Sequence, residues 1–145
     1  SSAASDVYKR QLIHHIAVTF DGSAVKHYID AKLDKTTSVS GSMSTSTYDL
    51  YIACRGDLDK FLQGDIFLLR IYDVALSQRE IAWNRLNYHR PARPGNLVLW
   101  LPLEEGSGLS VLDKSTYGNN GSLEPAGNPP SWRRVKQWSL RAETE

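Results

Sequence analysis

Oxygen-bearing side chains gather in the polar segment from residue 113 to residue 121. Carboxylate, hydroxyl and amide oxygens are the ligands of Ca²⁺, which takes about 6–8 of them, and the glycines of this segment allow tight curvature. A further carboxylate follows an apolar segment upstream. The predicted calcium ligands are Asp73, Asp113, Asn119 and Asn120, with a hydroxyl from Ser115. The alternative is a turn rich in Asp and Asn whose side chains bind their own backbone.

A second group of residues combines aromatic rings with cations near the end of the chain. Trp132, Arg134 and Trp138 fall on one face of an alternating segment. Stacking together with positive charge is a way to hold a glycan or single-stranded nucleic acid, so these three are the predicted ligand-binding residues. The alternative is a strand with a core-facing tryptophan and solvated arginines, because long cationic side chains often cover apolar surface.

Catalytic spacing is missing from the sequence. A retaining glycosidase holds two carboxyl groups about 5 Å apart, which on a strand requires alternating positions. Glu104 and Glu105 are adjacent, so their side chains point apart, and the same geometry prevents His14 and His15 from easily chelating one ion. With no nucleophile elbow and no glycine-rich phosphate loop, the sequence predicts no catalytic residue and a protein that is not an enzyme.

The composition excludes several classes of partner. The formal net charge is +1, so no overall field attracts nucleic acid or an anionic membrane. No apolar run approaches the ~20 residues that span a bilayer. A single cysteine, Cys54, excludes an internal disulfide and a cysteine-rich zinc site. The hydrophobic fraction of 41% is sufficient for a folded core.

The first half of the chain reads as strands joined by polar turns. His15 to Phe20 alternates apolar and polar residues, and Asp21-Gly22 is a tight-turn dipeptide before a second strand from Val25 to Ile29. The stretch 36–47, rich in Ser and Thr, predicts a loop or a weak edge strand. Two further strands are predicted over 48–54 and 66–72, the latter apolar on both faces as in a central strand.

One short helix and a second apolar strand follow. Ser77 and Glu80 have the spacing of a capping box, which predicts a helix that ends before Pro91. Two prolines and a glycine make 91–96 a linker. Leu97 to Leu103 is then a strongly apolar strand. Many strands with one helix predict an all-β fold, an antiparallel β-sandwich with one short helix.

Several of these segments together resemble the laminin-G-like, concanavalin A-like lectin-glucanase family. The similar segments are 14–22, 28–30, 64–77 and 80–81. Ala31 departs from the family pattern, which usually has glycine there. The resemblance implies a jelly-roll β-sandwich.

The order of the similar segments is unusual. Residues 12–90 resemble the back half of such a module, 91–96 is the linker, and 97–145 resembles the front of another. Residues 1–11 look like a translated sequencing adapter, which suggests a metagenomic fragment of a tandem repeat. One circularly permuted sandwich is the alternative. Because a strand apolar on both faces should not lie at a bare edge, we expect Leu97–Leu103 to pair beside Ile66–Tyr72 and complete one sandwich.

The resemblance implies a non-catalytic binding or adhesion module within a larger multi-module protein, with calcium as an optional aid to ligand binding. Its expected partners are a glycan or protein ligand and neighbouring modules, with no nucleic acid and no membrane span. An extracellular, cell-surface or virion location follows from that role. Two alternatives remain: a fragment of a glycoside hydrolase of this class, and a purely structural repeat in a surface or viral fibre protein.

Overall fold

The computed structural model describes residues 13–56 and 58–134, so the adapter-like segment 1–11 lies outside the described residues. The regular elements of the described part are mostly antiparallel strands, with a single α-helix. The described residues divide into two compact units: 13–42 with 74–92, and 43–56 and 58–73 with 93–134. No helix within the described ranges has the length and apolarity to cross a membrane.

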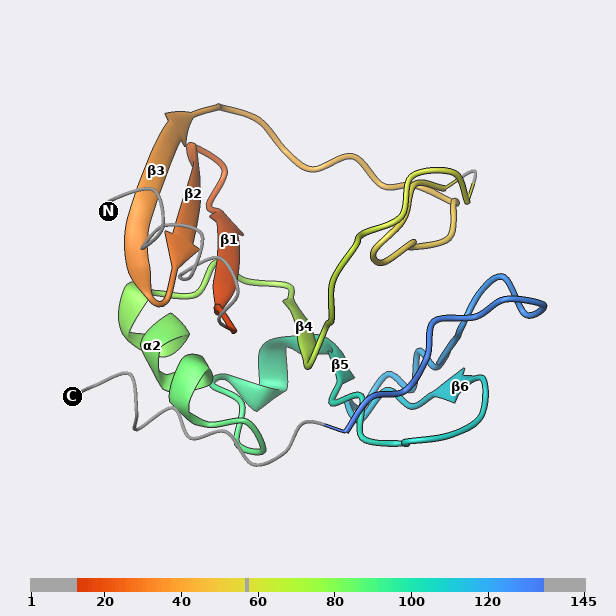
Figure 1. The fold of residues 1–145 in the computed structure, drawn as a ribbon. Coiled ribbons are helices and arrows are strands. Elements are labelled where there is room, and N and C mark those ends of the chain that lie inside the picture. The colour runs from red at the N-terminus through yellow and green to blue at the C-terminus, as the bar shows by residue number, and fades with distance from the viewer. Residues whose placement is uncertain (1–12, 57, 135–145) are drawn as a thin grey trace, which may run out of the picture. The chain divides into compact units, whose positions relative to one another are not determined.

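The first unit contains a three-stranded antiparallel sheet in the order β1-β2-β3 (Figure 1). Strand β1 (Ile16–Phe20) pairs with β2 (Ala24–Ile29) across the predicted turn, and β3 (Lys32–Ser38) follows. The Asp21 carboxylate accepts hydrogen bonds from the amides of Ser23 and Ala24, both at 2.9 Å. The hairpin predicted from alternation and Asp21-Gly22 is therefore confirmed.

The sheet exposes the face that the sequence suggested for burial. Ile16 and Val18 lie on the apolar face of β1, yet their side chains are 71% and 61% exposed. Tyr28, on the opposite face of β2, is buried. Alternation along β1 was correctly predicted, but alternation shows which residues share a face, and only the packed neighbours decide which face is covered.

The turn between β2 and β3 places two residues in left-handed backbone. Asp30 has φ 51° and Ala31 has φ 66°, and Ile29 pairs with Lys32 across them. Two consecutive positive φ angles in a two-residue loop are those of a type I′ hairpin turn. Alanine is strained there because its Cβ approaches the backbone.

We predict that Ala31→Gly stabilises the chain by about 0.5–1 kcal/mol, because relief of left-handed strain exceeds the added entropy of the unfolded chain. Urea denaturation measures the change. The matched control is Ala24→Gly in the regular backbone of β2, where glycine should instead destabilise by a similar amount. Two changes of the same sign would contradict the assignment of strain to Ala31.

The helix of the first unit begins at the predicted capping box. In α2 (Gln78–Leu86), Ser77 Oγ accepts from the Glu80 amide at 3.2 Å, and the Glu80 carboxylate accepts from the Ser77 amide at 2.8 Å. Gln78 Nε2 donates to the Ala31 carbonyl at 3.0 Å. The start of α2 is thus fixed locally and is also bonded to the β2–β3 turn.

The second unit contains the pair of apolar strands on either side of the linker. Strand β4 (Leu69–Tyr72) pairs antiparallel with β5 (Leu97–Leu101), after a 3-10 turn at Pro94–Asn96. This confirms that the two apolar strands lie side by side. β4 is shorter than predicted, however, because 66–68 have no ladder partner.

The core of the second unit lies on one face of the β4–β5 pair. Leu99, Leu101 and Val111 are its buried residues. The partly buried residues that pack against them are Leu69, Ile71, Leu103, Leu123 and Trp132. Two short strands, β6 (Ser110–Val111) and β7 (Gly121–Ser122), form a separate pair. Strand pairing in the described residues gives sheets of three, two and two strands.

The strand predicted over 48–54 is wrong. This segment is irregular, and its one ladder contact is an isolated bridge between Cys54 and Phe61. Leu50 is exposed, and among the described residues no strand pairs with this segment. Apolar alternation therefore did not produce a strand here, because a strand also requires a partner of matching register. The third strand of the first sheet is instead β3, whose charged residues 32–35 gave no strand signal. Its last residues, 36–38, belong to the stretch 36–47 for which a weak edge strand was one of the two predictions.

Candidate ligand-binding site

The predicted calcium loop, residues 113–121, is organised around the carboxylate of Asp113. Its Oδ1 accepts from the backbone amides of Trp100 and Ser115, both at 2.8 Å. Its Oδ2 accepts from the Ser115 hydroxyl and the Asn119 amide, both at 2.7 Å. A carboxylate has about four acceptor positions. All four are thus filled by groups of the chain.

Two asparagines of the same loop also bond to the backbone. Asn120 Oδ1 accepts from the Asp113 amide at 2.9 Å, and Asn119 Nδ2 donates to the Val98 carbonyl at 3.2 Å. The Lys114 amide donates to the Trp100 carbonyl at 2.8 Å. The loop therefore continues the hydrogen bonding of β5.

The charge state of Asp113 follows from the same contacts. Burial raises the pKa of this carboxyl, but hydrogen bonds from the Trp100 amide and from Ser115 and Asn119 outweigh burial, so the pKa lies below its ordinary value. Asp113 is therefore a charged group stabilised by four donors at neutral pH. Charge-assisted hydrogen bonds of this kind are stronger than neutral ones.

Asp73 lies at the end of β4 and has a different partner. Its Oδ1 accepts from Asn96 Nδ2 at 2.9 Å, and its amide donates to the Asn96 carbonyl at 3.0 Å. These bonds join the end of β4 to the turn before β5. No group of three or more His, Cys, Asp or Glu suited to a metal occurs in the ranges that the structure describes.

The structure thus brings Asp113, Asn119 and Asn120 together, whereas Asp73 is hydrogen-bonded to Asn96. A calcium ion at Asp113 would have to displace amides that now bind both carboxylate oxygens, so the arrangement fits the self-bonded turn better than a metal centre. We expect 5 mM calcium to shift the thermal midpoint by less than 1 °C, since an ion that binds the folded state must raise it. A saturable rise that magnesium does not reproduce would establish the calcium site instead.

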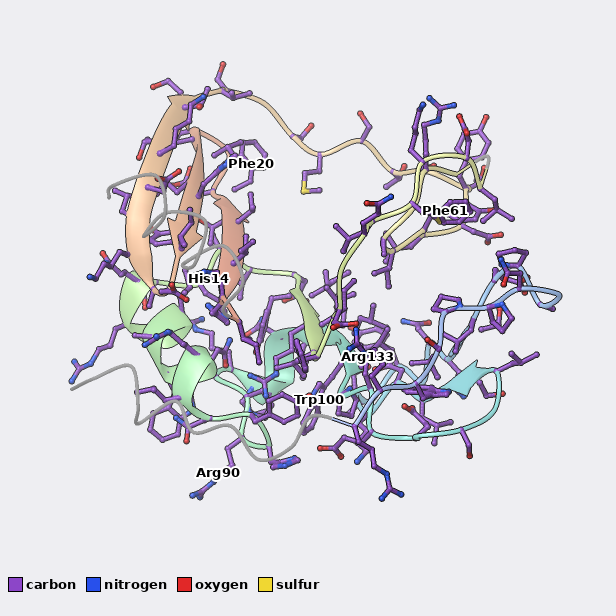
Figure 2. All side chains as sticks on the ribbon, viewed as in Figure 1. His14, Phe20, Phe61, Arg90, Trp100 and Arg133 are labelled. Carbon is purple, nitrogen blue, oxygen red and sulfur yellow. The ribbon has the colours of Figure 1, made fainter. Side chains whose placement is uncertain are left out.

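Of the three predicted ligand-binding residues, the structure describes Trp132 and Arg134. Trp132 packs against the core of the second unit, and its Nε1 donates to the Gly108 carbonyl at 2.8 Å. Its ring therefore contacts the core of the unit, as the core-facing alternative predicted. Arg134 is exposed, and Trp138 lies outside the described residues. The neighbouring Arg133, labelled in Figure 2, forms an ion pair with Asp65 at 3.1 Å.

A site that the sequence reasoning missed lies in the irregular segment after β3. An open pocket of about 560 Å³ is lined there by five residues, which we call the tyrosine pocket: Thr47, Tyr48, Asp49, Tyr51 and Gly56. Its volume is within the range of small-ligand sites. The signal in the sequence was two tyrosines and a carboxylate beside a Ser/Thr-rich loop. These residues were interpreted as part of the predicted strand over 48–54 and not as a site.

The two tyrosines are presented differently. Tyr48 is 90% exposed, with its amide bonded to Ser46 Oγ at 3.1 Å. Tyr51 is 41% exposed and lies against Gly56, where an added Cβ would be 3.4 Å from the ring. One ring is thus backed by the chain and the other projects into solvent.

A small hairpin supports the pocket. The Leu62 amide donates to the Ala53 carbonyl at 2.7 Å, and the Arg55 amide donates to the Lys60 carbonyl at 3.0 Å. Phe61, labelled in Figure 2, forms the isolated bridge with Cys54 in the same hairpin. These bonds hold the segment that carries Gly56.

The side chains of the tyrosine pocket can form stacking contacts and hydrogen bonds with a ligand. Its polar groups are one carboxylate, two phenols and one hydroxyl. Among the described residues, the Asp49 side chain has no hydrogen-bond or ion-pair partner in the chain. A glycosidase site needs a second carboxyl at a defined distance, and Asp49 is the one carboxylate that the described lining contains. The pocket can therefore stack on a ligand and accept hydrogen bonds from it.

Comparison with known proteins gives one match. The laminin-G family described as the concanavalin A-like lectin/glucanases superfamily matches residues 6–82. No curated protein and no solved structure matches the chain. The matched range contains strands β1 to β4 and all five residues of the tyrosine pocket, whereas Asp113 and Trp132 lie outside it.

Proposed function

The chain belongs to the concanavalin A-like lectin/glucanases superfamily, and from that membership we propose that it is a non-catalytic module that binds a carbohydrate or protein ligand. In this role the antiparallel strands form the scaffold and the loops carry the specificity, as is common for binding domains. We place the module in a larger extracellular, cell-surface or virion protein, beside neighbouring modules.

The observation that carries the proposal is the tyrosine pocket within the family-matched range. In the free protein the two exposed tyrosine rings keep apolar surface in contact with water, which is unfavourable. A ligand that covers the rings removes this surface from water. Tyrosine also offers a hydroxyl next to its apolar ring, which suits ligands with both kinds of surface. The uncommitted carboxylate of Asp49 adds a hydrogen-bond acceptor at the same place.

A fragment of a glycoside hydrolase is the second candidate, because the superfamily includes glucanases. The buried carboxylate of Asp113 does not favour it. All the acceptor positions of that carboxylate are filled by donors of the chain, whereas a catalytic acid or nucleophile must face its substrate. Incubation with a panel of oligosaccharides followed by reducing-end analysis separates the candidates, since only a hydrolase releases new reducing ends.

We predict that Tyr48→Ala and Tyr51→Ala each weaken ligand binding at least tenfold, because each removes a ring that the ligand covers. A glycan array and a pull-down of cross-linked protein partners identify the ligand, and calorimetry with it gives the affinities. Tyr117→Ala is the matched control, since Tyr117 is 60% exposed and lies outside the pocket. Equal affinity of all three variants and the unaltered chain would rule out the pocket as the binding site.

A further inference from the structure

The lining of the tyrosine pocket has a single electrostatic sign. Asp49 contributes a full negative charge, and it lines the pocket together with Tyr48 and Tyr51. The face of a tyrosine ring is the negative side of its quadrupole. None of the lining residues is a cation. The nearest cation in the sequence, Arg55, pairs with Asp59 at 3.0 Å instead. The pocket therefore gathers negative potential that the described chain does not neutralise there.

We propose that the tyrosine pocket binds an alkylammonium group, so that the ligand of this module carries a positively charged amine. The inference rests on the proposed function and adds the chemical class of the ligand. Aromatic faces within about 6 Å of a cation attract it through the ring quadrupole, and a carboxylate beside them pairs with its charge. Two rings with one carboxylate in an open pocket form such a binding arrangement.

The two tyrosines contribute to cation binding in distinct ways. Tyr51 lies against Gly56, so its ring is the tyrosine ring of the pocket that the backbone supports. Tyr48 is 90% exposed, with its amide bonded to Ser46 Oγ, so its ring has room to turn over a bound cation. Asp49 lies between the two tyrosines in the sequence and lines the same pocket. A neutral ligand would use the rings but would leave the carboxylate charge without a partner.

The alkylammonium group can come from an amino sugar or from a lysine side chain, which share this chemistry. The test therefore begins with the group alone. The full chain is titrated with tetramethylammonium chloride and with tert-butanol, a neutral molecule of similar size, and the tyrosine ring signals are followed by NMR. We expect saturable binding of the cation and at least tenfold weaker binding of the alcohol. Equal binding of both overturns the inference.

Variants keep the result specific to the pocket. Asp49→Asn retains the shape and removes the charge, and it should weaken cation binding at least fivefold, whereas Tyr48→Phe should retain binding because the ring remains. Tyr117→Ala is again the control. If Asp49→Asn binds the cation as well as the unaltered chain, the assigned role of the carboxylate is wrong and the inference fails.

Two further comparisons identify the source of the cation. Glucosamine is tested against glucose, and Nα-acetyl-lysine amide against Nα-acetyl-norleucine amide. Preference for the charged member of either pair supports the inference and names its source. If the module instead binds a neutral ligand through Tyr48 and Tyr51 and ignores all the amines, the proposed function stands and the inference falls. If the amines bind but no glycan or protein ligand is found, the inference stands and the proposed function falls.

Discussion

Asp113→Ala is expected to lower the free energy of unfolding by about 3 kcal/mol. The substitution removes a buried carboxylate that accepts four hydrogen bonds and leaves the amides of Trp100, Ser115 and Asn119 without that acceptor. Unsatisfied buried donors cost about 1–3 kcal/mol each, and the loop relaxes enough to recover part of this. Urea denaturation followed by tryptophan fluorescence measures the loss.

Asp34→Ala is the control for this variant, because Asp34 is exposed and makes no hydrogen bond or ion pair in the described chain. It should change stability by less than about 0.5 kcal/mol. The variant Asp113→Asn keeps the shape but turns one acceptor oxygen into a donor, so it should fall between the two. If Asp113→Ala were as stable as the control, the loop would not be organised by this carboxylate.

Asp113 should also make the free energy of unfolding depend on pH. The pKa of Asp113 is lower in the folded chain than its ordinary value of 3.8, as burial is outweighed by the bonded donors. A depressed pKa gives stability that is full above the ordinary pKa and is lost as the pH falls below it. The unaltered chain should therefore lose stability from about pH 4 downward, and Asp113→Ala should lose less over the same range. The pKa of Asp30 is lowered too, so some acid dependence should remain in the variant.

Leu101→Ala is expected to destabilise the chain by about 2–5 kcal/mol, through lost transfer energy and the cavity left behind. Leu101 is 5% exposed and pairs with Leu69 across the two strands. Leu112→Ala is the matched control, since Leu112 belongs to the same unit but is 50% exposed. Equal effects of the two substitutions would show that the face of β5 with Leu101 is not the core of the second unit.

The features that sequence predicted correctly are those encoded by neighbouring residues or by a strong burial requirement. The capping box needs only Ser77 and Glu80 three positions apart, and the first hairpin needs Asp21-Gly22 between alternating strands. The β4–β5 pair is distant in sequence, but both strands are apolar enough to require a covered position. Family membership was likewise available from short segments that keep their spacing.

The features that sequence missed depend on neighbours that a pattern does not specify. Alternation in β1 could not tell that Ile16 would be exposed while Tyr28 on β2 would be buried. Apolar residues around Tyr51 indicated a strand, but within the described residues the pairing of this segment is confined to the short hairpin contacts of 53–55 with 60–62. The tyrosine pocket was missed for this reason. In the Asp113 loop the sequence shows which side chains carry oxygen atoms, but it does not show that backbone amides bind the oxygens of Asp113.

The interleaving of the two compact units constrains how this protein can be dissected. Each unit is assembled from two separate stretches of chain, because 74–92 interrupts the second unit and 43–73 interrupts the first. A truncation at the linker before Leu97 would leave β4 without β5 and expose the apolar side of Leu69. Neither unit can be expressed as one continuous fragment, and a protease cut within either inserted stretch would nick both units without releasing one intact.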